Sequence, residues 1–475
     1  MKADKAKLFF ENFLVYGLGG IISKIIPFIM LPIVTRLIPE SRYFGLNDMS
    51  STIVSLSSYF AVMGMYDAMY RMFFEKEDIR YKKMVCSTTL LFTISTSAIV
   101  FILMVVFRRT IAAFFFDGAE YAYLVYISAT ATLVGATNSI ISAPTRMQNK
   151  RKVFLITNTV SPVLSYSISI PLLMAGHYVI ALPLAGLIAS LSMELIFYIL
   201  NRDWFSFRLF DNRLIKELVL IGLPLLPNML VYWVFNSADR VMITRLIGIG
   251  ESGIYAVGAK LGMASQLIYT AFAGGWQYFA FSTMKEENQV ESNSRIFEYL
   301  GVISFLCTVM ICIISEPLYR FVFTEEYHRA YIVAPYLFLA PLLQMLFQVE
   351  GNQFLVIKKT WPAMFILSAG LLLNIAFNYA LIPVIGIEGA AIATLLGYVV
   401  SDIICTLVLI KMKLMVISNR FLIASLTMLT GMALWRFVLQ YNIVLEILWL
   451  IAYGLLLIVL YQKEFKSILK IARKK

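Results

Sequence analysis

Two lysines within long apolar stretches are the residues of this sequence best placed to bind a charged molecule. Lys24 lies about sixteen residues into the apolar segment 8–34, and Lys260 lies about six residues into the segment 254–280. A charged side chain at the centre of a membrane helix costs about 2.5–3.5 kcal/mol on insertion scales, so it usually faces a cavity or a partner. We predict that both lysines line a central cavity and bind an anionic group such as a diphosphate.

Structural roles are open for both lysines. Lys24 can instead pair with an acidic residue in another apolar stretch, either Glu194 or Asp402. Lys260 can extend towards the headgroups at the outer membrane surface.

Four further charged residues lie near the ends of the apolar segments 8–34 and 217–238. Arg36, Arg240 and Arg245 are candidates for an outer gate or a substrate-release site. Anchoring of helix ends at the membrane surface is the alternative for all three. Asp239 is a candidate proton-coupling carboxylate, or else a partner of its neighbour Arg240 in a local ion pair.

The sequence predicts no catalytic residue, no cofactor and no metal site. The four cysteines lie in apolar stretches without Cys-x-x-Cys spacing, and the two histidines have no neighbouring metal ligands. No Gly-x-x-x-x-Gly-Lys-Ser/Thr loop is present, which argues against ATP hydrolysis. A polytopic enzyme needs outer loops or an intramembrane catalytic group, and neither is visible. These features favour transport over catalysis.

The composition predicts an all-α integral membrane protein. Sixty per cent of the 475 residues are apolar, 14% are charged, and the mean hydropathy is +0.80. Membrane helices need about twenty mostly apolar residues, because the hydrocarbon core is about 30 Å thick. Fourteen segments meet this length, and they cover residues 8–34, 46–66, 86–107, 121–143, 153–175, 178–200, 217–238, 254–280, 299–315, 331–349, 362–383, 388–410, 421–438 and 443–461.

The basic residues support this count of segments and give their orientation. If the N-terminus is cytoplasmic, most of the 40 Lys and Arg residues fall in cytoplasmic loops or in the C-terminal tail. Cytoplasmic loops of membrane proteins carry this excess. Both termini are therefore predicted to be cytoplasmic. The net charge of +12 is then explained by topology and lipid headgroups, with no nucleic acid as a partner.

A parallel internal repeat is predicted from short matches about 208 residues apart. Thr-Arg-Leu-Ile at residues 35–38 recurs at residues 244–247, and the basic pair at 150–151 corresponds to the pair at 358–359. This offset maps the first segment onto the seventh, which cross the membrane in the same direction. We predict a six-helix lobe at 1–210, a second six-helix lobe at 211–415, and two extra helices with a basic tail at 416–475.

Three blocks of sequence resemble bacterial polysaccharide flippases. The first is Tyr16-Gly17-Leu18-Gly19 with Pro27-Phe28 and residues 31–36, and the second is residues 222–227 with Asp239-Arg240 and residues 253–255. The most specific block resembles the penultimate hairpin of O-antigen and capsule repeat-unit flippases, and it comprises Asn374, Asn378, Pro383, Gly386, Gly389, Ala390, Ala391 and Thr394. These flippases belong to the multidrug/oligosaccharidyl-lipid/polysaccharide exporter superfamily.

The resemblance implies a non-enzymatic transporter in the bacterial inner membrane. Its expected substrate is an undecaprenyl-diphosphate-linked oligosaccharide, moved from the cytoplasmic to the outer leaflet by alternating access. Membrane lipids are expected partners, and the family implies a polysaccharide polymerase and a chain-length regulator. Two alternatives stay open at this point: an exporter of small cations or drugs driven by protons or sodium, and a flippase for a peptidoglycan lipid precursor.

Overall fold

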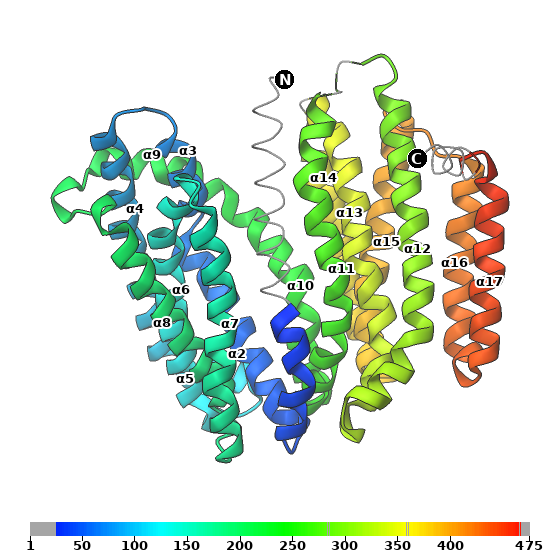
Figure 1. The fold of residues 1–475 in the computed structure, drawn as a ribbon, viewed down its shortest axis with the longest axis horizontal. Coiled ribbons are helices and arrows are strands. Elements are labelled where there is room, and N and C mark those ends of the chain that lie inside the picture. Colours follow the sequence, from blue (N-terminus) through cyan, green and yellow to red (C-terminus); the bar gives the residue numbers. More distant parts are fainter. Residues whose placement is uncertain are drawn as a thin grey trace. The chain divides into compact units, whose positions relative to one another are not determined.

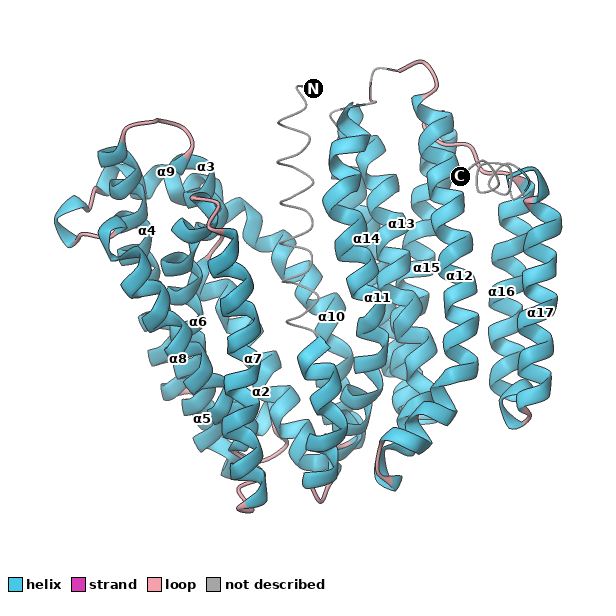
Figure 2. Cartoon of the chain, in the orientation of Figure 1, coloured by secondary structure: helices cyan, strands magenta, loops and turns pink. Residues whose placement is uncertain are grey.

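The structure is a computed structural model that describes residues 25–464, except 283, 285, 358 and 360, and also residue 466. The described residues form helices joined by short turns, and this part of the chain contains no strand (Figure 2). The predicted all-α class is therefore confirmed.

The helices follow one another with few long loops (Figure 1). After a helical segment at Ile25–Leu37, the α-helices are α2 (Ser41–Val62), α3 (Met65–Phe73), α4 (Ile79–Val106), α5 (Arg108–Phe115), α6 (Ala122–Met147), α7 (Arg151–Met174), α8 (Ala181–Asn201), α9 (Asn212–Gly222), α10 (Leu226–Ile247), α11 (Ile249–Ser282), α12 (Gln289–Val322), α13 (Ala334–Val356), α14 (Trp361–Ile385), α15 (Ile387–Lys411), α16 (Asn419–Phe437) and α17 (Ile443–Leu460).

The chain is a multi-pass membrane protein. Ten helical stretches among the described residues are long and apolar enough to cross a bilayer. Large apolar side chains on these helices point away from the protein; on α8, for example, Leu195 is 60% exposed and Ile199 is 58% exposed. Such surfaces suit hydrocarbon and would be unfavourable in water. The exact number of fourteen crossings stays a prediction.

One predicted crossing is built differently from the expectation. The single segment 217–238 corresponds to α9, a 3-10 turn at Leu223–Leu225, and α10. Pro224 and Pro227 lie at this junction, where proline removes a backbone N–H that an uninterrupted helix would use. α9, this turn and α10 together form one stretch, Asn212–Ile247, that is long and apolar enough to cross a bilayer, and α9 is its amphipathic first part.

The chain divides into two compact units, residues 1–256 and 257–475. The predicted lobes at 1–210, 211–415 and 416–475 remain a prediction. In the first unit α4, α6 and α8 run side by side (Figure 1). Small hydroxyl side chains lie on α4 and α6, and they donate to the preceding turn of their own helix, as Thr89 does to Val85 O at 2.8 Å and Thr132 to Ser128 O at 2.9 Å. Small residues let membrane helices approach closely.

Two glycines of the predicted repeat meet in the first unit. A Cβ on Gly45 of α2 would lie 2.1 Å from the carbonyl oxygen of Ile249, and a Cβ on Gly253 of α11 would lie 2.0 Å from that of Ser41. Gly45 and Gly253 are 208 positions apart, and so are Ser41 and Ile249. The two helix starts therefore make the same contact in both directions, as a two-fold relation between repeats requires.

In the second unit α12, α13, α14 and α15 pack side by side, and α16 and α17 pack against α12 (Figure 1). The α14–α15 hairpin carries the family-like block: Gly386 makes the turn with φ +64°, and Asn374 donates to Thr394 Oγ1 at 3.2 Å. The last two helices are tied by Trp435 of α16, whose indole N–H donates to Glu446 of α17 at 2.8 Å. These polar contacts hold helices whose outer surfaces face lipid.

Candidate functional site

A buried charge network lies in the first unit where α2, α10 and α11 meet. Arg240 of α10 faces Asp48 of α2, with Nε 3.5 Å from Oδ2, and the side chains are only 18% and 8% exposed. A buried ion pair contributes little net stability, but removing one partner costs about 3–5 kcal/mol because the other charge is stranded. The pair therefore holds α10 against α2.

Asp239 belongs to the same network but points to a different partner. Its carboxylate accepts a hydrogen bond from the Tyr255 hydroxyl of α11 and another from the backbone N–H of Arg240 at 2.8 Å. The guanidinium of Arg240 contacts the carboxylate of Asp48. The negative charge of Asp239 also acts on the guanidinium, so the local pair of Asp239 and Arg240 is one part of a larger network. Three helices are thus joined by four polar side chains.

Of the three arginines predicted near helix ends, Arg36 and Arg245 lie there, whereas Arg240 lies seven residues before the end of α10. Arg245 is exposed and donates to the carbonyl of Ala113 at 3.0 Å. The guanidinium of Arg245 also lies over the Phe114 ring and 3.9 Å from the carboxylate of Asp117. Arg36 is exposed in the last turn of the segment Ile25–Leu37. The contacts of Arg245 tie the end of α10 to the region of α5 within the first unit.

Of the two lysines predicted to line a cavity, the structure describes only Lys260. Lys260 is half-buried in α11, in the second unit. Two glycines on either side of it, Gly258 and Gly262, bring α11 against Ala330, Val333 and Leu337. Lys24 lies outside the described residues.

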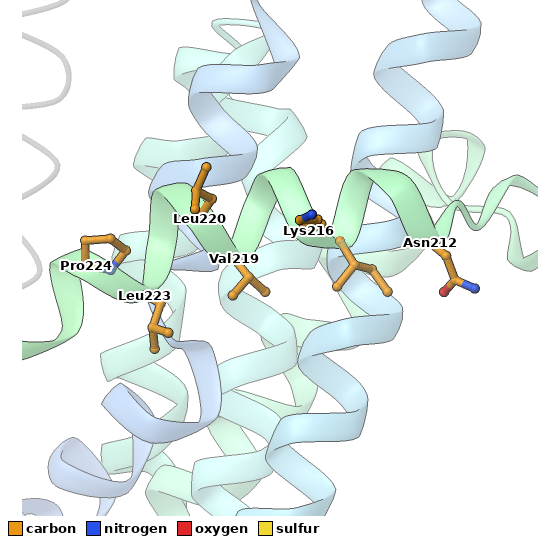
Figure 3. Close-up of a pocket in the computed structure, with 7 residues that line it drawn as sticks. Asn212, Lys216, Val219, Leu220, Leu223 and Pro224 are labelled. Carbon is orange, nitrogen blue, oxygen red and sulfur yellow. The ribbon is translucent and has the colours of Figure 1, made fainter.

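An open apolar groove of about 510 Å³ runs along α9 (Figure 3). In Figure 3 α9 runs across its neighbours rather than along them, and the groove is lined by Asn212, Ile215, Lys216, Val219, Leu220, Leu223 and Pro224. The opposite face of α9 buries Leu214 and Leu218 against α3 and α4. Leu220 is 75% exposed, four residues after Lys216 and thus on the same face. Apolar side chains beside one ammonium group suit a lipid chain with an anionic head.

A more polar cavity of about 410 Å³ lies in the second unit, between α12 and the α16–α17 turn. Glu316 and Arg320 form an ion pair at 2.6 Å in its wall, and Tyr331, Gln440 and Glu446 also line it. Among the described residues, no cluster of three or more His, Cys, Asp or Glu side chains is arranged to hold a metal ion.

Sequence reasoning missed Asp48 and Tyr255 as members of the buried network. Tyr255 was noticed only as part of residues 253–255, whose glycine corresponds to Gly45, and Asp48 belongs to none of the motifs. A carboxylate at position 48, three residues after the repeated Gly45, was the available signal. Its partner Arg240 is distant in sequence, so only the fold identifies the pair.

The comparisons with known proteins agree with this architecture. The model of a family described as polysaccharide biosynthesis protein matches residues 33–332. The chain belongs to this family. The match begins in the helical segment Ile25–Leu37 and ends just before α13, so it includes the charge network of Asp48, Asp239 and Arg240.

A curated relative is the teichuronic acid biosynthesis protein TuaB of Bacillus subtilis (strain 168). It is 22% identical over 317 residues, which are 63% of this chain. The match covers 65% of the relative's own length, slightly less than two thirds.

Solved structures share the fold at low sequence identity. Lipid II flippase MurJ in an inward closed conformation has a TM-score of 0.74 at 15% identity, with 95% of this chain and 100% of that chain covered. The MATE multidrug transporter DinF-BH has a TM-score of 0.60 at 17% identity, covering 85% and 95%. A MOP superfamily transporter from Pyrococcus furiosus has a TM-score of 0.59 at 15% identity, with the same coverage. The chain therefore shares the fold of these three proteins.

Proposed function

We propose that this protein is a flippase that moves oligosaccharide repeat units linked to undecaprenyl diphosphate from the cytoplasmic to the outer leaflet of the bacterial inner membrane. The observation that carries the proposal is the family match over residues 33–332 in a chain that folds as a multi-pass helical transporter. Surface polysaccharide biosynthesis, as of O-antigen or capsule, is the process it would serve.

The chemistry of such a substrate explains which side chains are useful. Each sugar hydroxyl left unpaired in hydrocarbon costs a few kcal/mol, so the glycan needs a polar, hydrated path. The diphosphate requires Lys or Arg partners. We assign the diphosphate or an acidic sugar to Lys24 and Lys260, with Arg36, Arg240 and Arg245 as further candidates, and keep Asp239 as a candidate coupling carboxylate.

The groove along α9 suits the remaining part of the substrate. An isoprenoid chain can lie along Leu220 and Leu223, and Lys216 at the rim can bind a phosphate. With the N-terminus cytoplasmic, α9 lies on the cytoplasmic side, where the substrate is synthesised. The groove is thus a candidate first contact with the lipid carrier.

A second candidate function is a flippase for a peptidoglycan lipid precursor. The TM-score of 0.74 to lipid II flippase MurJ, against 0.60 to the multidrug transporter DinF-BH, favours this alternative over a drug exporter. Both lipid-linked substrates carry a diphosphate, so the cavity lysines serve either one.

Deletion and complementation in the source bacterium test the proposal. The expected result is loss of surface glycan, with the lipid-linked repeat unit retained in the inner leaflet and growth preserved. Loss of growth with accumulation of the peptidoglycan precursor would instead support the second candidate. Unchanged surface glycan with increased sensitivity to small cationic toxins would reject both in favour of a drug exporter.

A further inference from the structure

The second unit contains two buried carboxylates that neither the family match nor the predicted substrate site explains. Glu350 of α13 is 0% exposed and Asp402 of α15 is 7% exposed. The two helices pack against each other, and the charge of Glu350 acts on Asp402. Two ionised carboxylates this close repel each other, and burial has removed the water that would stabilise each charge.

Among the described residues, Glu350 has neutral hydrogen-bond donors and Asp402 has none. Thr406 of α15 donates to Glu350 Oε1, and the Cys405 thiol also contacts this carboxylate. Thr406 follows Asp402 by four residues, so both lie on the face of α15 that meets α13. Within the described part of the chain, both oxygens of Asp402 and Oε2 of Glu350 have no hydrogen-bond partner. Buried polar atoms in folded proteins are otherwise almost always paired.

Among the described residues, no ion pair within 4 Å joins Glu350 or Asp402 to a cation. α13 carries no other charged residue and α14 carries none, while α11, which meets α13 where Gly262 contacts Leu337, carries Lys260 but no charge over 262–282. Most charged residues on the neighbouring helices form ion pairs with each other, and these pairs are Glu291 with Arg295, Glu316 with Arg320, Glu298 with Arg420, and Glu388 with Arg436. Lys411, at the end of α15, is exposed. The charged residues of the 3-10 helix Glu325–Val333, which are Glu325, Glu326, His328 and Arg329, precede α13 and are thus at its far end. Tyr398, one turn before Asp402, is the remaining titratable neighbour on α15.

A line of buried amides leads from the pair to one end of the unit. Gln353 follows Glu350 on the next turn of α13 and binds Gln289, the first residue of α12, at 2.8 Å. Asn293, one turn further into α12 and therefore back towards the level of Glu350, is 2% exposed, and neither of its side-chain polar atoms has a partner within the described residues. Amide groups of this kind hold water in protein interiors. Glu350 lies about 9 Å along the helix from the end of α13 at Val356.

From this geometry we propose that Glu350 and Asp402 together bind one exchangeable proton, which enters and leaves past the buried amides of Asn293, Gln353 and Gln289. Binding forms one O–H bond on a carboxylate oxygen and neutralises one of the two charges. Release returns the proton to water at the end of the unit where α13 ends, the cytoplasmic side in the predicted orientation. Deprotonation restores the repulsion between α13 and α15 and favours their separation.

This site supplies a driving ion for the proposed transporter, and that part of the inference rests on the proposed function. Proton binding itself is measured without any substrate. Infrared difference spectra between acidic and alkaline buffers are recorded on the full chain in lipid nanodiscs. The signal is the carbonyl band of protonated carboxylic acid. The wild type is expected to show the band, and the double variant Glu350→Gln/Asp402→Asn to lack it.

The single variants test whether the two groups act as a pair. Glu350→Gln and Asp402→Asn are each expected to change the pH at which the band disappears, because each removes a neighbouring charge. Glu446→Gln is the matched control, since Glu446 is also a buried carboxylate but accepts from Trp435. It is expected to leave the band of the pair unchanged. Circular dichroism confirms that each variant keeps its helical content.

Three results would overturn the inference. Absence of the band in the wild type would mean that a cation neutralises the pair, for example Lys24 outside the described residues. Loss of the band when sodium chloride replaces choline chloride at constant pH would identify a sodium site instead. A double variant that restores surface glycan fully would remove the coupling role, while a failure of the flippase proposal would leave the infrared result unaffected.

Discussion

The reciprocal contact between Gly45 and Gly253 makes the packing of the two helix starts sensitive to a single methyl group. In Gly253→Ala the new Cβ would lie 2.0 Å from the carbonyl oxygen of Ser41, and in Gly45→Ala it would lie 2.1 Å from that of Ile249. Both obstacles are backbone atoms, so no side-chain rotation relieves the overlap. We expect both variants to be less stable than the wild type.

The expected loss of stability follows from the distance by which α2 and α11 must move apart in each variant. Non-bonded heavy atoms are most favourable about 3.5–4.0 Å apart, so α2 and α11 must move apart by about 1.5 Å. Overpacking of this kind costs about 1–3 kcal/mol, and the rigid obstacle places both variants near ~3 kcal/mol. One separation relieves both overlaps, so the double variant Gly45→Ala/Gly253→Ala is expected to lose clearly less than the sum of the single losses.

The free energy of unfolding is measured by titration with sodium dodecyl sulfate in mixed micelles. Labelling of Cys86, Cys312 and Cys405 by a thiol-reactive dye reports unfolding, because all three thiols are buried in the folded chain. Gly135→Ala in α6 is the matched control, since a Cβ there meets no atom within 4 Å. Alanine is the better helix former by about 1 kcal/mol, so the control is expected to be unchanged or slightly more stable.

The reasoning would be refuted if Gly253→Ala were as stable as Gly135→Ala. It would also be refuted if the two single losses were additive in the double variant, because the two overlaps would then belong to independent contacts.

Three further predictions concern the charged and polar groups. Asp48→Asn leaves the Arg240 guanidinium buried without its nearest acidic partner and should lose about 3 kcal/mol in the same titration. The triple variant Asp48→Asn/Asp239→Asn/Arg240→Met leaves no charge unpaired and should recover most of this loss, and equal losses in both variants would contradict a stranded charge. Lys260→Ala should reduce the rate at which surface glycan is restored roughly 10- to 100-fold, because a hydrogen bond to a charged group contributes about 1.5–3 kcal/mol. Lys260→Arg at equal expression should retain most of the wild-type rate, and full activity of the alanine variant would remove Lys260 from the substrate path. Trp435→Phe leaves Glu446 without its indole donor and should cost about 1–3 kcal/mol, while Trp361→Phe, at a 61% exposed position, should cost much less; similar losses would contradict the role of the hydrogen bond.

The helical membrane fold was predictable because its cause is local. A membrane helix satisfies its own backbone hydrogen bonds, so length and apolar composition are enough to locate it. The predicted segment 388–410 and the observed α15 (Ile387–Lys411) differ by one residue at each end. The predicted segment 217–238 lies within the observed stretch Asn212–Ile247, and Pro224 and Pro227, which divide this stretch into α9 and α10, are local signals as well.

The reciprocal glycine contact joins positions that the predicted repeat already related, since the repeat was inferred from matching residues at a nearly constant offset. Gly45 and Gly253 were visible in the sequence as equivalent positions. The sequence did not show that these two glycines contact each other or which carbonyl groups they meet. Both depend on how the starts of α2 and α11 approach in space.

The partners of the charged residues were decided by tertiary structure alone. Sequence reasoning placed Asp239 beside Arg240 because they are neighbours in the chain, yet the structure joins Arg240 to Asp48 and Asp239 to Tyr255. Glu350 and Asp402 are 52 positions apart, and nothing in either segment indicates that they meet. Composition determines that the chain enters a membrane, because transfer to hydrocarbon depends on each residue separately. Charge pairing depends on distances between helices, and those distances exist only once the helices have packed.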